Sequence, residues 1–93
     1  HKAFGEAYEN LDELIDEFVE VYQGKNGIQV PSDGFKIKLE NLDSNPEDMI
    51  DVFIEFLKDE LPEDLEKDDT DLLNIRDEMM GLLNKTKYLL MLK

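Results

Sequence analysis

The 93-residue sequence contains no cysteine, no tryptophan and only one histidine. Without cysteine, the chain has neither a disulfide framework nor a thiolate metal site, and this composition fits a reducing cytoplasm. No apolar run approaches the roughly 20 residues that span a bilayer, and no basic segment precedes an apolar one at the N-terminus. We therefore expect a cytoplasmic protein with no signal peptide and no association with a membrane.

Basic residues are also scarce. The chain has 10 lysines and arginines against 24 aspartates and glutamates, which gives a net charge of −14. This charge opposes contact with a phosphate backbone, so we expect no binding to nucleic acid. The same field attracts divalent cations or a basic protein partner, although solubility is the plainer interpretation for most carboxylates. A DNA mimic that blocks a nucleic-acid-binding protein is a third function class, supported by charge alone.

The first stretch, residues 1–24, has the apolar spacing of a helix in a bundle. Its apolar residues recur at intervals of four and three, which places them on one face of a helix. They are Phe4, Tyr8, Leu11, Ile15, Phe18 and Tyr22, with Ala7, Leu14 and Val19 beside them. We expect this helix to end at Gly24, because the run from Gln23 to Gly27 offers two glycines and an asparagine for a left-handed cap.

A second helix is predicted at about 46–61. Asn45 has the chemistry of an N-cap, and Pro46 is pre-organised for the first helical position. Pro62 is expected to end the helix. Before it, residues 25–44 are predicted to form a crossover connection, either extended along the bundle or pairing with another subunit.

A third helix is predicted at about 69–92, with Asp69 or Thr70 as its N-cap. Leu65, in the acidic turn before it, is expected to tuck inward. The expected apolar stripe consists of Leu72, Ile75, Met79, Leu82 and Leu89, joined by Leu73, Met80, Leu83 and Leu90, so the end of the helix is apolar on more than one side. The methionines Met79, Met80 and Met91 are expected to fill the core, with an adaptable partner-binding surface as the alternative. The apolar tail of this helix predicts burial against something beyond its own hairpin.

One edge of the first helix carries side chains that can bind metal. His1, Asp16 and Glu20 border its apolar face, together with Asp12 and Gly5. Their spacing, His-x14-Asp-x3-Glu, resembles the second helix of the Dps mini-ferritins, and the ending TKYLLMLK is similar to the hydrophobic close of that family's last helix. The chain also resembles small ferritin-like proteins encoded by phages. The resemblance covers the first and last parts of the chain, and the middle matches only in predicted helicity.

The resemblance implies that His1, Asp16 and Glu20 are iron ligands of a ferroxidase site. His1 and Asp16 are 15 positions apart, or about 22 Å along a helix, so one copy cannot bring them to the same metal. Two antiparallel copies related by a twofold axis could place His1 of one copy beside Asp16 and Glu20 of the other. Gly5 stands where the family commonly has a further carboxylate. The alternative interpretation is a solvated helix flank that begins with a histidine left from a tag.

Together these observations predict a single all-α domain over residues 1–93, a ferritin-like up-down helical bundle. Three of its helices lie in this chain, and the first bundle helix is expected upstream of His1. The leading function is iron binding, with Fe(II) oxidation and storage at a site between subunits. The alternative is a non-catalytic, acidic structural or protein-interaction component, virion-associated if phage-encoded. A homo-oligomer is expected, because so short a chain leaves apolar surface that three helices cannot hide.

Overall fold

Three helices and the turns that join two of them make up the part of the chain that the structure describes. The computed structural model describes residues 2–27 and 46–92. Its elements are α1 (Lys2–Asn26), α2 (Pro46–Glu55), the π-helical turn η3 (Phe56–Glu60), the 3-10 turn η4 (Leu61–Asp64) and α3 (Thr70–Met91). No strand occurs within these ranges, so the all-α prediction is confirmed for them. None of the described helices is long and apolar enough to cross a membrane.

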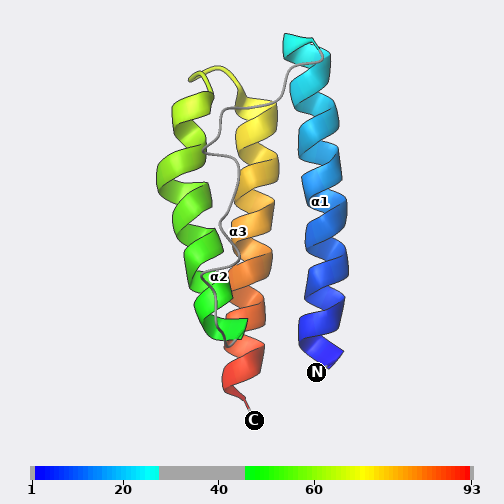
Figure 1. Cartoon of the computed structure of the whole chain (residues 1–93), viewed down its shortest axis with the longest axis vertical. Helices are drawn as coiled ribbons and strands as arrows, with labels where there is room; N and C mark the ends of the chain where they lie inside the picture. The colour runs from blue at the N-terminus through cyan, green and yellow to red at the C-terminus, as the bar shows by residue number, and fades with distance from the viewer. Residues whose placement is uncertain (1, 28–45, 93) are drawn as a thin grey trace.

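The third helix lies between the other two. α1 and α2 run in the same direction, and α3 runs antiparallel to both and packs against each (Figure 1). The first residues of α1 and α2 therefore lie at the same end of the molecule as the last residues of α3. The predicted crossover at 25–44 falls mostly on residues 28–45, outside the described part, whereas Lys25 and Asn26 belong to α1.

The core forms where the three helices meet. Its largest fully buried side chains are Phe18, Leu57, Leu61 and Leu72, contributed by α1, the two turns and α3. Ile50, Phe56, Ile75, Met79, Leu83 and Leu90 complete this cluster. Leu65 packs against its edge, as the sequence predicted.

Most of the predicted apolar face of α1 turns toward this core. Leu11, Ile15 and Tyr22 pack against the buried cluster around Phe18. The prediction for Tyr8 is wrong, because its side chain is 63% exposed. It lies about 80° around the helix from Phe18, at the edge of the apolar face.

The first helix ends later than predicted. It continues through Gly24 to Asn26, whose side-chain amide donates to the carbonyl oxygen of Tyr22 at 3.1 Å. Gly27 then adopts a φ of +82°, the left-handed conformation expected of a helix C-terminal cap. The cap is therefore at Gly27, and the prediction that placed it at Gly24 is wrong. A single glycine inside a helix costs only about 1 kcal/mol, which tertiary contacts of the last turn can offset.

Alanine substitutions at the two glycines are expected to change stability in opposite directions. Gly24→Ala should stabilise the protein by up to about 1 kcal/mol, because an added Cβ meets no atom within 4 Å and alanine favours the helix. Gly27→Ala should destabilise it by about 1 kcal/mol, because alanine resists a positive φ. Urea unfolding of the two variants measures both changes. Destabilisation by Gly24→Ala, with no effect of Gly27→Ala, would indicate that the helix ends at Gly24, as the sequence predicted.

The second helix does not stop at Pro62 as predicted. Regular α-helix ends at Glu55, a π-turn follows, and Pro62 lies within the first turn of a further 3-10 helix. In the π-turn the N–H of Leu61 donates to the carbonyl oxygen of Phe56, five residues back. In the same pattern, the carbonyl oxygen of Leu57 would accept a hydrogen bond from residue 62. That residue is Pro62, which has no backbone N–H to donate. The predicted N-cap Asn45 lies outside the described residues.

A side chain from α3 supplies the hydrogen-bond donor that Pro62 lacks. The Nη1 atom of Arg76 donates to the carbonyl oxygen of Leu57 at 3.1 Å. The Arg76 side chain is only 18% exposed and also pairs with Asp77. A carbonyl left without a donor by Pro62 thus fixes the π-turn to α3.

We expect Arg76 and Pro62 to be energetically coupled. Arg76→Met should cost about 1.5–3 kcal/mol, because it leaves the Leu57 carbonyl without its charged donor. The same substitution should cost less in a Pro62→Ala background, where the restored amide can serve that carbonyl. A double-mutant cycle by urea unfolding measures the difference. Equal costs in both backgrounds would contradict the role given to Pro62, and Asp77→Asn controls for the exposed ion pair.

The buried stripe of α3 differs from the predicted one in its second half. Leu72, Ile75 and Met79 are buried as predicted, but the stripe continues through Leu83 and Leu90. These two lie 11 and 18 residues after Leu72, which returns them to almost the same helical angle. The predicted stripe residues Leu82 and Leu89 are half-buried and 38% exposed, respectively.

Two further predictions for α3 need correction. Met91 does not fill the core, because its side chain is 69% exposed, whereas Met80 packs against the core. Asp69 occupies the N-cap position, but its carboxylate makes no capping bond. Its Oδ2 atom instead accepts a hydrogen bond of 2.8 Å from the backbone N–H of Glu66.

Candidate functional site

The structure places two of the three predicted metal ligands on one helix flank. Asp16 and Glu20 lie one turn apart on α1, and both are exposed. His1 lies outside the described residues, so the three-residue site remains a prediction. Within 2–27 and 46–92, no three acidic, histidine or cysteine side chains are grouped to hold a metal ion. A third ligand would therefore have to come from a residue outside these ranges, such as His1, or from another molecule.

The flank that carries these two carboxylates is a row of like charges. Asp12, Asp16 and Glu20 follow one another at intervals of four, and all three are exposed. They take part in none of the ion pairs formed by the described residues. Like charges at this spacing destabilise a helix by a few tenths of a kcal/mol per pair. A cation bound to Asp16 and Glu20 would relieve this repulsion, and carboxylate oxygens suit a hard ion.

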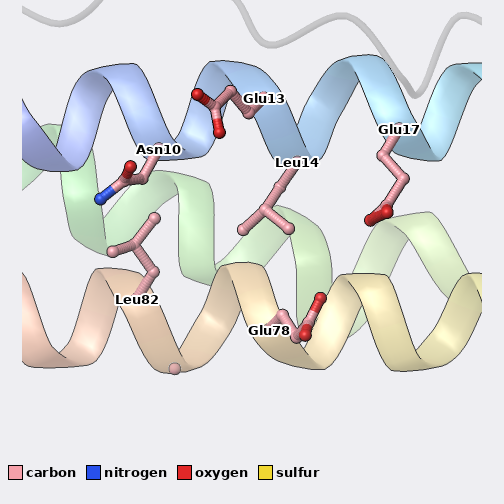
Figure 2. A pocket seen from close by; sticks show the side chains of 7 residues that line it. Asn10, Glu13, Leu14, Glu17, Glu78 and Leu82 are labelled. Carbon is pink, nitrogen blue, oxygen red and sulfur yellow. The ribbon is translucent and has the colours of Figure 1, made fainter.

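A second acidic feature lies on the other flank of α1, in a groove shared with α3. The groove has a volume of about 480 Å³ and is lined by Asn10, Glu13, Leu14, Glu17, Glu78, Gly81 and Leu82. Leu14 and Glu17 point across it toward α3, and Leu82 and Glu78 point back toward α1 (Figure 2). We call it the α1–α3 groove.

The lining of the α1–α3 groove favours a cationic, partly apolar occupant. Glu13, Glu17 and Glu78 give it a negative rim, and the two leucines provide apolar surface. Its lining includes no histidine, serine or threonine that could act as a base or a hydroxyl nucleophile. Glu13 and Glu17 lie one turn apart on α1, and helical spacing alone does not bring Glu78 of α3 beside them. The sequence could not indicate this groove, because the position of Glu78 beside α1 depends on how α3 packs against α1.

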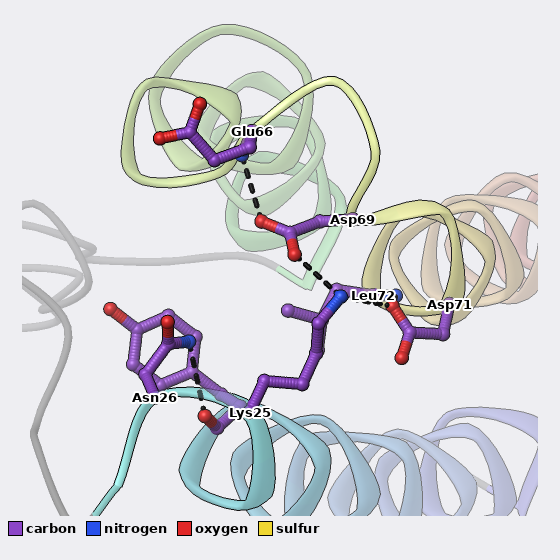
Figure 3. Close-up of polar contacts among 7 residues, drawn as sticks. Lys25, Asn26, Glu66, Asp69, Asp71 and Leu72 are labelled. Carbon is purple, nitrogen blue, oxygen red and sulfur yellow. Dashed lines mark hydrogen bonds and ion pairs between the residues drawn. The ribbon is translucent and has the colours of Figure 1, made fainter.

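A cluster of charged residues, at the end of the molecule where α1 finishes and α3 begins, holds these two helices together. Lys25 forms ion pairs with Asp69 and with Asp71, the latter at 2.8 Å (Figure 3). The amide of Glu66 and then Lys25 lower the pKa of Asp69, and Lys25 lowers the pKa of Asp71. Hydrogen bonds to Asp69 and then to Asp71 raise the pKa of Lys25. These aspartates are therefore engaged in structural contacts between α1, the turn before α3 and the start of α3.

Exposed apolar side chains collect toward the end where α1 and α2 begin and α3 finishes. Tyr88, Met91 and Leu92 on the tail of α3 are 59%, 69% and 60% exposed. Tyr8 on α1 and Val52 on α2 are also exposed. The described residues do not cover this surface, and the burial expected for the apolar tail against another partner stays a prediction.

The comparisons with known proteins identify a family but no activity. A family model described as a family of unknown function (DUF5856) matches residues 1–90. No curated protein and no solved structure matches the chain.

Proposed function

The chain belongs to the DUF5856 family, and from its own residues we propose that it is a ferritin-like subunit that binds iron at a site shared between two copies. Asp16 and Glu20 supply two carboxylate ligands from α1, and His1 of a second copy supplies the nitrogen ligand. Iron is the substrate in this proposal, and dioxygen accepts the electrons when bound Fe(II) is oxidised. The observation that carries the proposal is the exposed Asp16–Glu20 pair, one turn apart and free of ion pairs among the described contacts.

The directions of the helices support the ferritin-like part of the proposal. Ferritin-like bundles contain one long crossover connection, which makes the helices before and after it parallel. α1 and α2 are parallel, and 19 positions separate Gly27 from Pro46. α3 packs antiparallel against both. Val19 on α1 and Phe53 on α2 are only half-buried, so each keeps apolar surface that a further helix of the bundle would cover.

The chemistry of the flank supports a hard cation. The row Asp12, Asp16 and Glu20 is exposed and carries unbalanced negative charge. In a protein of net charge −14, such a row concentrates divalent cations near the helix. Two carboxylates at a spacing of four residues can chelate one ion together, and a nitrogen ligand adds preference for iron over calcium or magnesium.

Iron titration of the unmodified full-length protein tests the proposal. Fe(II) added without oxygen should bind with a defined stoichiometry, measured by calorimetry. Admission of air should then produce ferric absorbance in the near ultraviolet, faster than in buffer. Native mass measured in the same sample should correspond to an oligomer. Absence of saturable Fe(II) binding would contradict the proposal.

A second candidate is an acidic interaction component with no metal chemistry. The α1–α3 groove favours it, because its negative rim and apolar leucines suit a basic amphipathic segment of a protein partner. The exposed apolar end of the bundle also suits a protein contact. A protein that assembles normally but does not bind Fe(II) would support this second role.

A further inference from the structure

The side of α3 that borders the α1–α3 groove carries a row of residues that none of the described helices buries. We call this row the α3 face, and it consists of Asn74, Glu78, Gly81, Leu82, Lys85 and Leu89. All six are exposed or half-buried, and their positions fall within about 100° of the helix circumference. The buried stripe of the same helix occupies the neighbouring arc, which begins beside Leu82 at Ile75. Within residues 2–27 and 46–92, the α3 face therefore keeps surface that could contact another molecule.

The α3 face is symmetric about the midpoint between Gly81 and Leu82. Asn74 and Leu89 lie equally far from that point, and so do Glu78 and Lys85. An antiparallel copy of α3 related by a twofold axis through this point would place each residue opposite its mirror position. Glu78 of either copy would then lie opposite Lys85 of the other, which gives two ion pairs of opposite charge.

Gly81 marks the point of closest approach. A Cβ at this position would meet no atom within 4 Å, so packing inside the chain does not require glycine. In the middle of a helix glycine costs about 1 kcal/mol relative to alanine. A residue without a side chain lets the backbone of a second helix come close. Gly81 and Leu82 also line the α1–α3 groove, so α1 does not fully cover this stretch of α3.

We propose that two copies of this chain pack through the α3 face, with their α3 helices antiparallel and crossing at Gly81, and with Glu78 of each copy paired with Lys85 of the other.

Charge complementarity selects a second copy as the occupant. Two chains of net charge −14 repel each other, so contact between them requires local pairs of opposite sign. Glu78 and Lys85 provide these pairs, and neither takes part in an ion pair among the described residues. The contact would also cover the exposed part of Leu82 and Leu89. The inference does not depend on iron binding.

Charge reversal tests the pairing directly. Sedimentation equilibrium of the full chain should show a two-copy association at micromolar concentration. Glu78→Lys and Lys85→Glu should each weaken it at least tenfold, because each turns two attractive contacts into two repulsive ones. The double variant should recover the association, and so should an equimolar mixture of the two single variants, in which both pairs again have opposite signs. A mixture that stays as weak as its components would overturn the proposal.

Gly81→Leu separates loss of association from loss of folding. Leucine should raise the thermal midpoint of the chain, because it favours the helix over glycine and its Cβ meets no atom within 4 Å. The same side chain should weaken the two-copy association at least tenfold by keeping the helices apart. A bulky residue that raises stability and leaves association unchanged would overturn the crossing at Gly81. Asp16→Asn with Glu20→Gln should leave this association intact, which distinguishes a failure here from a failure of the iron proposal.

Discussion

Replacing Asp16 by asparagine and Glu20 by glutamine is expected to abolish saturable Fe(II) binding and the ferric absorbance that follows in air. The two substitutions preserve side-chain size and helix geometry, but they remove the anionic oxygens that a hard cation prefers. The protein should stay folded, because both residues are exposed and make no ion pair among the described residues. Stability should rise slightly if anything, because the repulsion with Asp12 is removed.

A matched pair on α2 and its π-turn controls for the general acidic field. Glu55 and Asp59 are also a glutamate and an aspartate four positions apart, and both are exposed. Glu55→Gln with Asp59→Asn removes the same charge from another surface, so iron binding and oxidation should survive. Equal loss of iron binding in both double variants would mean that net charge alone attracts iron. Asp16 and Glu20 would then not form a specific site.

Phe18→Ala is expected to remove about 3–5 kcal/mol from the free energy of unfolding. Its side chain is completely buried at the centre of the core, where a truncation leaves a cavity that helices cannot easily close. Domains of this size are stable by only about 5–14 kcal/mol, so the variant should be partly unfolded near physiological temperature. Thermal and urea unfolding followed by circular dichroism measure the change.

Tyr8→Ala is the control for this core substitution. It also removes an aromatic ring from α1, but one that is 63% exposed. Its cost in a single chain should stay within about 0.5 kcal/mol. A large loss at Tyr8, comparable to the loss at Phe18, would mean that another molecule covers that end of the bundle in solution.

The existence and order of the helices followed from the sequence, because apolar residues at intervals of three and four leave few alternatives. The choice between neighbouring leucines did not follow. Leu82 and Leu83 both fit a helical stripe, and only the positions of α1 and α2 decide that Leu83 is buried. The contact of Lys25 with Asp71 joins residues 46 positions apart, and nothing local to either residue indicates it.

Local stop signals were only partly informative. Either Gly24 or Gly27 could have formed the C-terminal cap of α1. The structure has the cap at Gly27, because the last turn of α1 continues to Asn26. Pro62 did prevent a regular α-helix, but Arg76 from another helix allowed the turns to continue around it. For the candidate site, helical spacing was sufficient to place Asp16 and Glu20 on one exposed flank. The sequence could not show the α1–α3 groove, because it depends on packing between helices.

The order in which the helices are connected has a consequence for how the molecule folds and opens. α2 and α3 are joined through a short turn, so their contacts close small loops, whereas α1 reaches α3 only after a much longer stretch of chain. Short-range contacts form first, so we expect a hairpin of α2 and α3 to precede the docking of α1. The reverse process is a partial opening that releases α1 and leaves the hairpin intact. Native-state hydrogen exchange should then show the α1 amides sharing one opening free energy, lower than that of the amides in the middle of α3.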